Sequence, residues 1–225
     1  MTGLFVTGTG TDVGKTVVSA ALLHRYRHVA PLRYWKPVQT GTPMDDDTAS
    51  VKALGICGVD EIYAAGVRLP RPLSPHLAAE LCGVKIDVSS VVRLACKASS
   101  PRGWIVEGAG GVLVPLNRNE LMADLMAALG LPVLIVASSQ LGTINHTLLT
   151  LEALRSRSIP IAGVLLNGPS NAENWRAIET YGKVAVVGEM PRFGVLEPKL
   201  LAAWAVQKLD PDRYLEPFLT GLPPC

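Results

Sequence analysis

The sequence lacks the features of membrane, secreted and nucleic-acid-binding proteins. No apolar run approaches the roughly 20 residues that a membrane-spanning helix needs, and the first residues show no basic segment or signal-peptide layout. The formal charge is only +2, from 21 basic and 19 acidic residues, with no basic cluster. Binding to nucleic acid needs a concentrated basic surface. We therefore expect a cytoplasmic protein with neither a membrane nor a nucleic acid as partner.

Cysteine pairs and catalytic triads are also missing. The four cysteines, Cys57, Cys82, Cys96 and Cys225, are scattered without a C-x-x-C pair. We expect free thiols in a reducing compartment and no zinc site. No Ser-His-Asp arrangement or paired general acid and base is evident. Phosphoryl transfer, which depends on positioning and charge neutralisation, needs no such arrangement.

Strand-like and helix-like segments alternate along the 225 residues, of which 48% are apolar. The strand-like runs are rich in Val and Ile and do not alternate with polar residues, which is typical of parallel strands covered on both faces. These runs span 4–7, 32–35, 104–107, 133–137, 161–167 and 184–187, and the helical patterns span 16–28, 88–97, 122–129, 143–156 and 174–181. The order predicts one α/β domain over residues 1–225, ending in a loose tail at 218–225.

Residues 8–16, Gly-Thr-Gly-Thr-Asp-Val-Gly-Lys-Thr, are the most informative segment. Glycines permit a turn whose N–H groups face an anion, and the following helix adds its positive dipole end. Lys15 can reach terminal phosphates, and the Thr16 hydroxyl can bind Mg²⁺. The segment predicts a phosphate loop and a three-layer P-loop NTPase-like fold, with helices on both faces of a mostly parallel sheet. The pattern is offset, because Thr9 stands where a glycine is expected and Gly8 lies one place earlier.

Two alternative interpretations of this segment account for less of it. A plain strand-to-helix turn leaves the glycines and Lys15 without a role. A dinucleotide-binding fingerprint needs an acidic residue about 20 positions on to bind the ribose. Here the second strand-like run ends in Lys36, which suits phosphate or carboxylate chemistry.

Polar residues gather after the strand-like runs, where ligands bind in parallel sheets. Glu107 is either a loop acid or an Mg²⁺ ligand, and Asp45–Asp47 is either a solvated run or the source of another ligand. Lys36 is either a surface lysine or a cation over a transferred phosphoryl group. Asn167-Gly168 is either a turn or a contact to a nucleotide base. Residues 141–146 open either an ordinary capped helix or a site for a substrate carboxylate.

These segments together resemble the dethiobiotin synthetases, over most of residues 4–192 and in the same order. The offset Gly8 is this family's form. The matching elements are Thr7-Gly8-Thr9-x-Thr11-x-Val13-Gly14-Lys15-Thr16, Lys36-Pro37-Val38-Gln39-Thr40-Gly41, Asp47 in Asp-x-Ala, Ser74-Pro75-His76, Val106-Glu107-Gly108-Ala109-Gly110-Gly111, Leu141-Gly142-x-Ile144-Asn145-His146 and Gly188-Glu189-x-Pro191.

The resemblance implies a homodimeric ligase of biotin biosynthesis that depends on ATP and Mg²⁺. One amine of 7,8-diaminopelargonate (7,8-diaminononanoate) takes up CO₂ as a carbamate, and ATP phosphorylates the carbamate oxygen. The second amine then closes the ureido ring of dethiobiotin, releasing ADP and phosphate.

The resemblance also implies site residues. Lys15 and Lys36 correspond to the catalytic cations that stabilise the carbamate and the transferring phosphoryl group. The Mg²⁺ ligands correspond to Thr16, Asp47 and Glu107. Nucleotide-binding positions are Asp12, Val13, Gly14, Lys15, Thr16, Val17, Asp47, Glu107, Gly108, Ala109, Gly110, Asn167, Gly168, Leu196, Glu197 and Pro198. Substrate positions are Thr11 and Thr40, with Leu141, Gly142 and Asn145 acting across the dimer interface.

Some features depart from the family pattern or favour other families. Asp12 stands where many members have a longer acid, and the chain past Pro191 matches poorly, so the base-lining residues and the preference for ATP stay open. Switch ATPases of the ParA/MinD kind carry a signature lysine at the position of Gly10, and their membrane-bound members often end in a basic amphipathic helix, whereas this tail is rich in proline. Cobyrinate-type amidating synthetases bring a glutaminase domain, for which this chain has no room.

Overall fold

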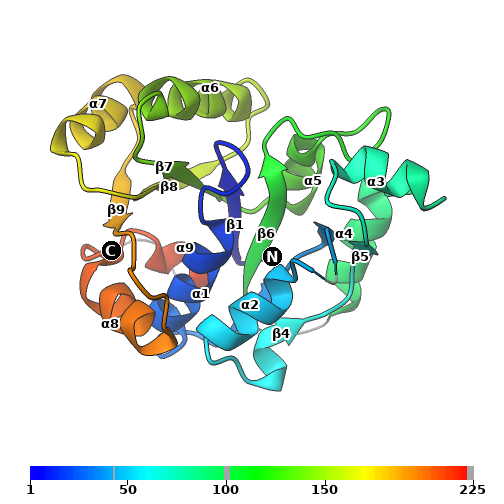
Figure 1. Ribbon diagram of the computed structural model, residues 1–225, viewed down its shortest axis with the longest axis horizontal. Helices are drawn as coiled ribbons and strands as arrows, with labels where there is room; N and C mark the ends of the chain where they lie inside the picture. Colours follow the sequence, from blue (N-terminus) through cyan, green and yellow to red (C-terminus); the bar gives the residue numbers. More distant parts are fainter. Residues whose placement is uncertain (43, 99–101, 222–225) are drawn as a thin grey trace.

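A computed structural model describes residues 1–42, 44–98 and 102–221 of the protein. Within these residues, seven parallel strands form a central sheet in the order β4-β2-β6-β1-β7-β8-β9 (Figure 1). The strands are β1 (Gly3–Gly8), β2 (Leu32–Trp35), β4 (Ile62–Tyr63), β6 (Gly103–Gly111), β7 (Val133–Ser138), β8 (Ile161–Asn167) and β9 (Val186–Met190). The parallel sheet expected from the sequence is confirmed, and each strand-like run overlaps one of its strands.

Helices cover both faces of this sheet and form two apolar cores. One core is built with side chains of α1, α2, α8 and α9, and the other with side chains of α3 to α7. The helices are α1 (Lys15–Tyr26), α2 (Asp47–Leu54), α3 (Pro75–Leu81), α4 (Val88–Lys97), α5 (Met122–Leu129), α6 (Thr143–Arg155), α7 (Ala172–Gly182), α8 (Pro198–Lys208) and α9 (Glu216–Thr220). The expected three-layer arrangement is therefore confirmed.

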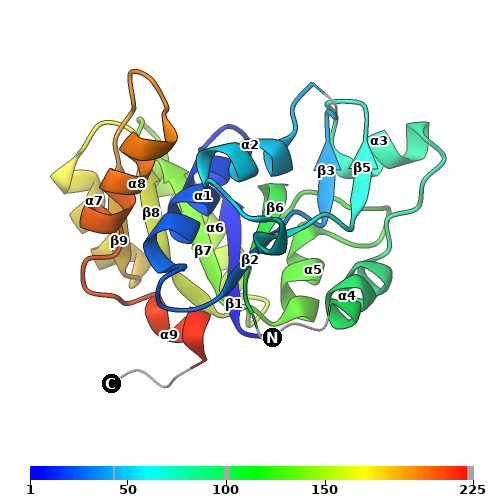
Figure 2. The ribbon, with the colours of Figure 1, turned by 90° about the horizontal axis from the view of Figure 1, so that it is seen from below.

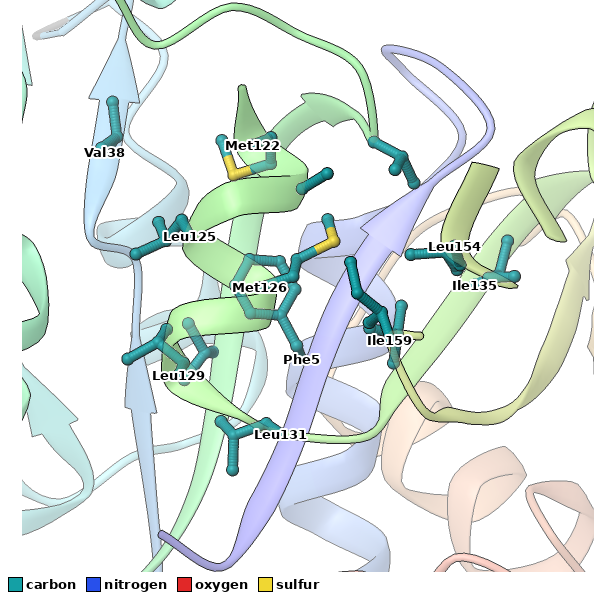
Figure 3. Close-up of a cluster of buried hydrophobic side chains, with 14 of the residues drawn as sticks. Phe5, Val38, Met122, Leu125, Met126, Leu129, Leu131, Ile135, Leu154 and Ile159 are labelled. Carbon is teal, nitrogen blue, oxygen red and sulfur yellow. The ribbon is translucent and has the colours of Figure 1, made fainter. Parts of the chain in front are cut away.

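Strand β1 lies at the centre of the molecule, with all of its residues buried. Its side chains alternate between the two faces, so Phe5 belongs to one core and Leu4 and Val6 belong to the other. Figure 3 shows Phe5 among the side chains of Met122 and Met126 from α5. Burial on both faces explains why this strand is a continuous apolar run in the sequence.

The carboxyl ends of the strands meet along one edge of the sheet. Figure 2 shows this edge at the top, where α2 and the loop between β1 and α1 lie. A small parallel sheet of β3 (Val38–Thr40) and β5 (Val67–Leu69) stands beside it. Parallel topology thus delivers the segments that follow β1, β2, β6, β7 and β8 to the same side of the molecule.

The C-terminal region differs from the expected loose tail. Residues 216–220 form α9, and Leu219 is buried in the core that contains α1 and β1. The rest of the expected tail, residues 222–225, lies outside the described residues. In the described ranges no helix has the length and apolar character needed to cross a bilayer.

Candidate active site

The loop from residue 9 to residue 14 forms the floor of the candidate site. It leaves the buried strand β1 and enters α1 through Gly14, whose φ of 98° is in the left-handed region that favours glycine. Lys15 begins the helix, is 7% exposed, and reaches back so that its Nζ donates to the Gly10 carbonyl at 2.9 Å. The first N–H groups of α1 have no partner within the helix, which is the arrangement that holds anions.

Close packing behind the loop also requires glycine at position 14. The Asn167 side chain, at the end of β8, donates from Nδ2 to the Val13 carbonyl at 2.9 Å. A Cβ added to Gly14 would collide with this amide. The backbone at residue 14 is therefore fixed both by its own conformation and by contact with the neighbouring strand end.

Glu107, near the middle of β6, is the centre of the site. Its carboxylate is completely buried. One oxygen, Oε1, accepts hydrogen bonds from Thr16 Oγ1 at 3.0 Å and Lys36 Nζ at 2.8 Å. The other oxygen, Oε2, accepts from Ser19 Oγ and Tyr34 Oη, each at 3.0 Å. Four donors from α1, β2 and the residue after β2 thus surround one carboxylate.

Asp47 completes this group from the start of α2. Its carboxylate accepts from Thr16 Oγ1 at 2.7 Å and forms an ion pair with Lys36. The preceding residue, Asp46, has a different role, because its side chain accepts from the Ala49 N–H at 3.1 Å and caps α2. The structure therefore separates a capping aspartate from a site aspartate within the acidic run.

The two lysines of the site have opposite pKa shifts. Burial opposes the charge on Lys36, but Glu107 and Asp47 outweigh it and raise the pKa of this ammonium. Burial and the nearby Lys36 charge lower the pKa of Lys15, although carboxylates partly offset them. Burial raises the pKa of Asp47, but Lys36 more than compensates and the net pKa is lowered. Lys36 and Asp47 therefore stabilise each other as a charged pair.

A cavity of about 450 Å³ opens above these groups. Most of the site residues predicted from the sequence line this cavity, together with Asp45, Ser50 and Leu54. The selected residues in its lining are Thr11, Asp12, Gly14, Lys15, Thr16, Val17, Lys36, Thr40, Asp47, Glu107, Ala109, Gly110 and Leu196. The predicted metal and catalytic positions, and most of the predicted phosphate-binding positions, thus border one cavity.

Other selected residues lie outside the lining. Leu141 and Asn145, at the start of α6, are exposed, and Gly142 is partly exposed. Asn167 is engaged with the phosphate loop through its amide nitrogen. The remaining selected residues outside the lining are Val13, Gly108, Gly168, Glu197 and Pro198.

Two buried hydroxyl groups were missed by the sequence analysis. Ser19 lies one helical turn after Thr16 on α1, and Tyr34 lies two residues before Lys36 on β2. Residues three apart share a face of a helix, and residues two apart share a face of a strand. This spacing could have indicated that Ser19 lies beside Thr16 and Tyr34 beside Lys36. Their apolar neighbours in the sequence instead made them look like core positions.

The oxygen atoms around Thr16 fit a hard divalent cation. Thr16 Oγ1 carries a single proton and lies within hydrogen-bond distance of two carboxylates, so the hydroxyl cannot donate fully to both. Two carboxylates and a hydroxyl beside a phosphate loop are the protein ligands that Mg²⁺ accepts, with phosphate and water supplying the others. Among the described residues, no group of three or more His, Cys, Asp or Glu side chains is arranged as a metal site.

Comparisons with known proteins show which family the chain resembles over most of its length. A family model described as "AAA domain" matches residues 2–199. The ATP-dependent dethiobiotin synthetase BioD of Paramagnetospirillum magneticum is 50% identical over 190 residues, covering 84% of this chain and 88% of that protein. The enzyme of the same name from Rhodopseudomonas palustris is 43% identical over 217 residues, covering 96% and 98%.

Solved structures share the fold at much lower identity. A chain of the MinC:MinD cell division protein complex from Aquifex aeolicus aligns with a TM-score of 0.60 at 12% identity, covering 100% of this chain and 98% of that chain. A ParA family ATPase from Chlorobium tepidum aligns with a TM-score of 0.57 at 14% identity, covering 98% of both chains. These likenesses concern the fold alone, whereas the identity to the synthetases extends over most of the sequence. The chain therefore belongs to the dethiobiotin synthetase family.

Proposed function

We propose that this protein uses ATP to carboxylate 7,8-diaminopelargonate with CO₂ and to close the ureido ring of dethiobiotin. The observation that carries the proposal is the single contact group of Thr16, Lys36, Asp47 and Glu107 beside the phosphate loop. This group combines a cation with hard oxygen ligands at the point where the terminal phosphate of a bound nucleotide is expected. The relatives from P. magneticum and R. palustris are named for the same activity.

Thr16, Asp47 and Glu107 are the residues that would hold Mg²⁺. The metal would supply charge neutralisation on the phosphates of ATP. Lys15, whose ammonium lies over the loop, is assigned to the terminal phosphates. Lys36 is assigned to the carbamate oxygen and the transferring phosphoryl group, because its raised pKa keeps it charged and it lies between the two carboxylates.

The remaining assignments concern the nucleotide and the diamine. The loop residues 12–17 and the glycine segment 108–110 would hold the phosphates. Asn167 and Gly168, with Leu196 to Pro198, would contact the base, and Leu196 borders the cavity. Thr11 and Thr40 also border the cavity and would contact the diamine.

We infer that the protein acts as a homodimer in which Leu141, Gly142 and Asn145 hold the substrate carboxylate of the partner's site. Two facts support this inference. Leu141 and Asn145 are exposed at a helix start. Beside the outer side of the phosphate loop lies a largely apolar hollow that includes Leu113 and Leu149, both more than half exposed. A second copy covering this hollow would bury those side chains.

The test is the substrate dependence of ADP formation. The purified protein with Mg²⁺ and ATP is expected to form ADP only when diaminopelargonate and bicarbonate are both present, with dethiobiotin appearing in equal amount. Omission of either substrate is the control. Strong ATP hydrolysis without the diamine, stimulated by DNA or lipid vesicles, would contradict the proposal and favour a switch ATPase.

A further inference from the structure

The two oxygens of Glu107 have different surroundings. Oε1 contacts Thr16 and Lys36, which border the cavity. Oε2 contacts Ser19 and Tyr34, neither of which borders it. The side chains of Ser19, Tyr34 and Glu107 are all completely buried. The carboxylate is therefore held from behind by two neutral hydroxyl groups and faces the cavity through one oxygen.

The two hydroxyl groups occupy the hydrogen-bonding capacity of Oε2. A carboxylate oxygen offers two lone-pair directions, and Ser19 and Tyr34 each donate to Oε2 at 3.0 Å. The donors come from different elements, α1 and β2, so the carboxylate cannot rotate about its terminal bond without losing both contacts. Oε1 also accepts two hydrogen bonds, but its donors Thr16 and Lys36 border the cavity, and Thr16 is itself a proposed metal ligand. The donors to Oε2 do not border the cavity, so a metal that enters from it meets Oε1.

The difference between the two Glu107 oxygens should affect Mg²⁺ and Ca²⁺ binding differently, because the two ions differ in how many oxygens of a carboxylate they use. Mg²⁺ binds its ligands at about 2.0–2.1 Å in octahedral geometry. A carboxylate can contribute to this geometry through a single oxygen. Ca²⁺ takes about 6–8 oxygens at about 2.3–2.6 Å and frequently binds both oxygens of one carboxylate. We propose that Ser19 and Tyr34 are positioning residues that make the metal site select Mg²⁺ over Ca²⁺, because they restrict Glu107 to one ligating oxygen. This inference rests on the magnesium site proposed above.

The test removes each hydroxyl group while keeping the rest of the side chain. Ser19→Ala, Tyr34→Phe and the double variant are compared with wild type for binding of Mn²⁺, a Mg²⁺ substitute visible by electron paramagnetic resonance. A non-hydrolysable ATP analogue is present throughout, and Mg²⁺ and Ca²⁺ are titrated separately as competitors. The matched controls are Tyr63→Phe, which removes a hydroxyl bound to the Leu94 carbonyl, and Ser156→Ala, which removes one bound to the Ala153 carbonyl.

The expected result is a change in the ratio of the two competition constants. Loss of groups that orient a metal ligand typically changes metal affinity about 10- to 100-fold. The double variant should therefore bind Ca²⁺ about tenfold better relative to Mg²⁺ than wild type does. Each single variant should show a smaller shift, and the controls should show none. The single variants keep the measurement available if the double variant does not fold.

Two outcomes would overturn the inference in distinguishable ways. An unchanged ratio, including an equal loss of affinity for both ions, would show that Ser19 and Tyr34 serve only the stability of the core. Unchanged Mn²⁺ binding in Glu107→Gln would show that the metal binds elsewhere, and this would remove the proposed magnesium site together with its selectivity. Diamine-dependent ADP formation, measured in parallel, reports on the proposed activity independently of both results.

Discussion

At the scale of single residues, Lys36 neutralises the negative charge of the site by pairing with two carboxylates. Its side chain is 5% exposed and its ammonium contacts both Asp47 and Glu107. Without this cation, two carboxylates would remain close together with only neutral donors between them. Buried charges that lose their partner are strongly unfavourable.

Lys36→Ala should therefore lower the turnover number by about 100- to 1,000-fold, the effect of removing one preorganised donor to a developing charge. The measurement is steady-state dethiobiotin formation at saturating substrates. Lys52→Ala, on the exposed side of α2, is the control that removes a lysine from the same region. Turnover close to wild type in the Lys36 variant would remove this residue from the proposed catalytic role.

The sequence predicted the charged residues of the site better than the neutral ones. Lys36 and Glu107 could be selected because a charge that borders a buried strand needs a partner or a ligand, and Asp47 because it lies within a matching motif. Ser19 and Tyr34 could not be selected by that reasoning, because a hydroxyl group in an apolar run looks the same whether it packs in a core or supports a carboxylate. Only the three-dimensional contacts distinguish the two cases.

At the scale of elements, α4 shows how one side chain fixes a helix start. The Asp87 carboxylate accepts from Ser90 Oγ at 2.7 Å, Ser89 Oγ at 2.8 Å and the Ser90 N–H at 2.9 Å. These hydrogen bonds, the Ser90 hydroxyl first, lower the pKa of Asp87 to about 2. This helix was correctly predicted at residues 88–97, because its apolar residues recur at helical spacing.

The lowered pKa makes the stability of the protein depend on Asp87 in acid. Since the folded pKa is below the ordinary value of 3.8, the contribution is complete above about pH 4 and is lost as pH falls toward 2. Asp87→Asn keeps a capping side chain that cannot titrate. The urea midpoint of this variant should decline less between pH 4 and pH 2 than that of wild type.

The control is Asp212→Asn, at an exposed aspartate in the segment between α8 and α9. Its urea midpoints should follow the wild-type pH dependence. Identical pH dependence in wild type and Asp87→Asn would contradict the role of this carboxylate in acid stability.

Elements without a strong sequence signal were the ones that the sequence analysis missed. α2 follows an acidic run, and α3, α8 and α9 each have proline in the first turn, which resembles a loop when seen in isolation. Strands β3, β4 and β5 have only two or three residues each, too few for a periodic pattern. Tertiary packing decides the conformation of such short segments.

At the scale of the whole molecule, Asp210 ties the C-terminal segment to α1. Its carboxylate is 1% exposed and accepts from the Tyr26 hydroxyl and from the N–H groups of Tyr214, at 2.9 Å, and Leu215, at 2.7 Å. Arg25 donates to the Leu209 and Asp210 carbonyls at 2.9 and 3.0 Å. Residues 209–215, which directly precede α9 and the expected loose tail at 218–225, are therefore anchored to the C-terminal end of α1.

Tyr26→Phe should destabilise the fold by about 1–3 kcal/mol, because the buried Asp210 carboxylate loses a donor. Urea unfolding at pH 7 measures the change. Turnover at a temperature well below unfolding should stay at the wild-type level, since Tyr26 does not border the cavity. Tyr181→Phe, at a tyrosine that is 72% exposed, is the control and should be neutral.

Equal stability of Tyr26→Phe and wild type would contradict this anchoring role. A loss of turnover without a loss of stability would instead connect the Tyr26 and Asp210 contact to the site at the other end of α1.

The central position of β1 has a consequence for synthesis on the ribosome. This strand is made before both of its neighbours, β6 and β7, which are residues 103–111 and 133–138. The nascent chain therefore carries a largely apolar strand with both edges open until β6 is made, and with one edge open until β7 is made, when more than half of the 225 residues have been joined. Open strand edges invite pairing with other chains. A chaperone that shields β1 during translation would protect this protein more than one that acts after release.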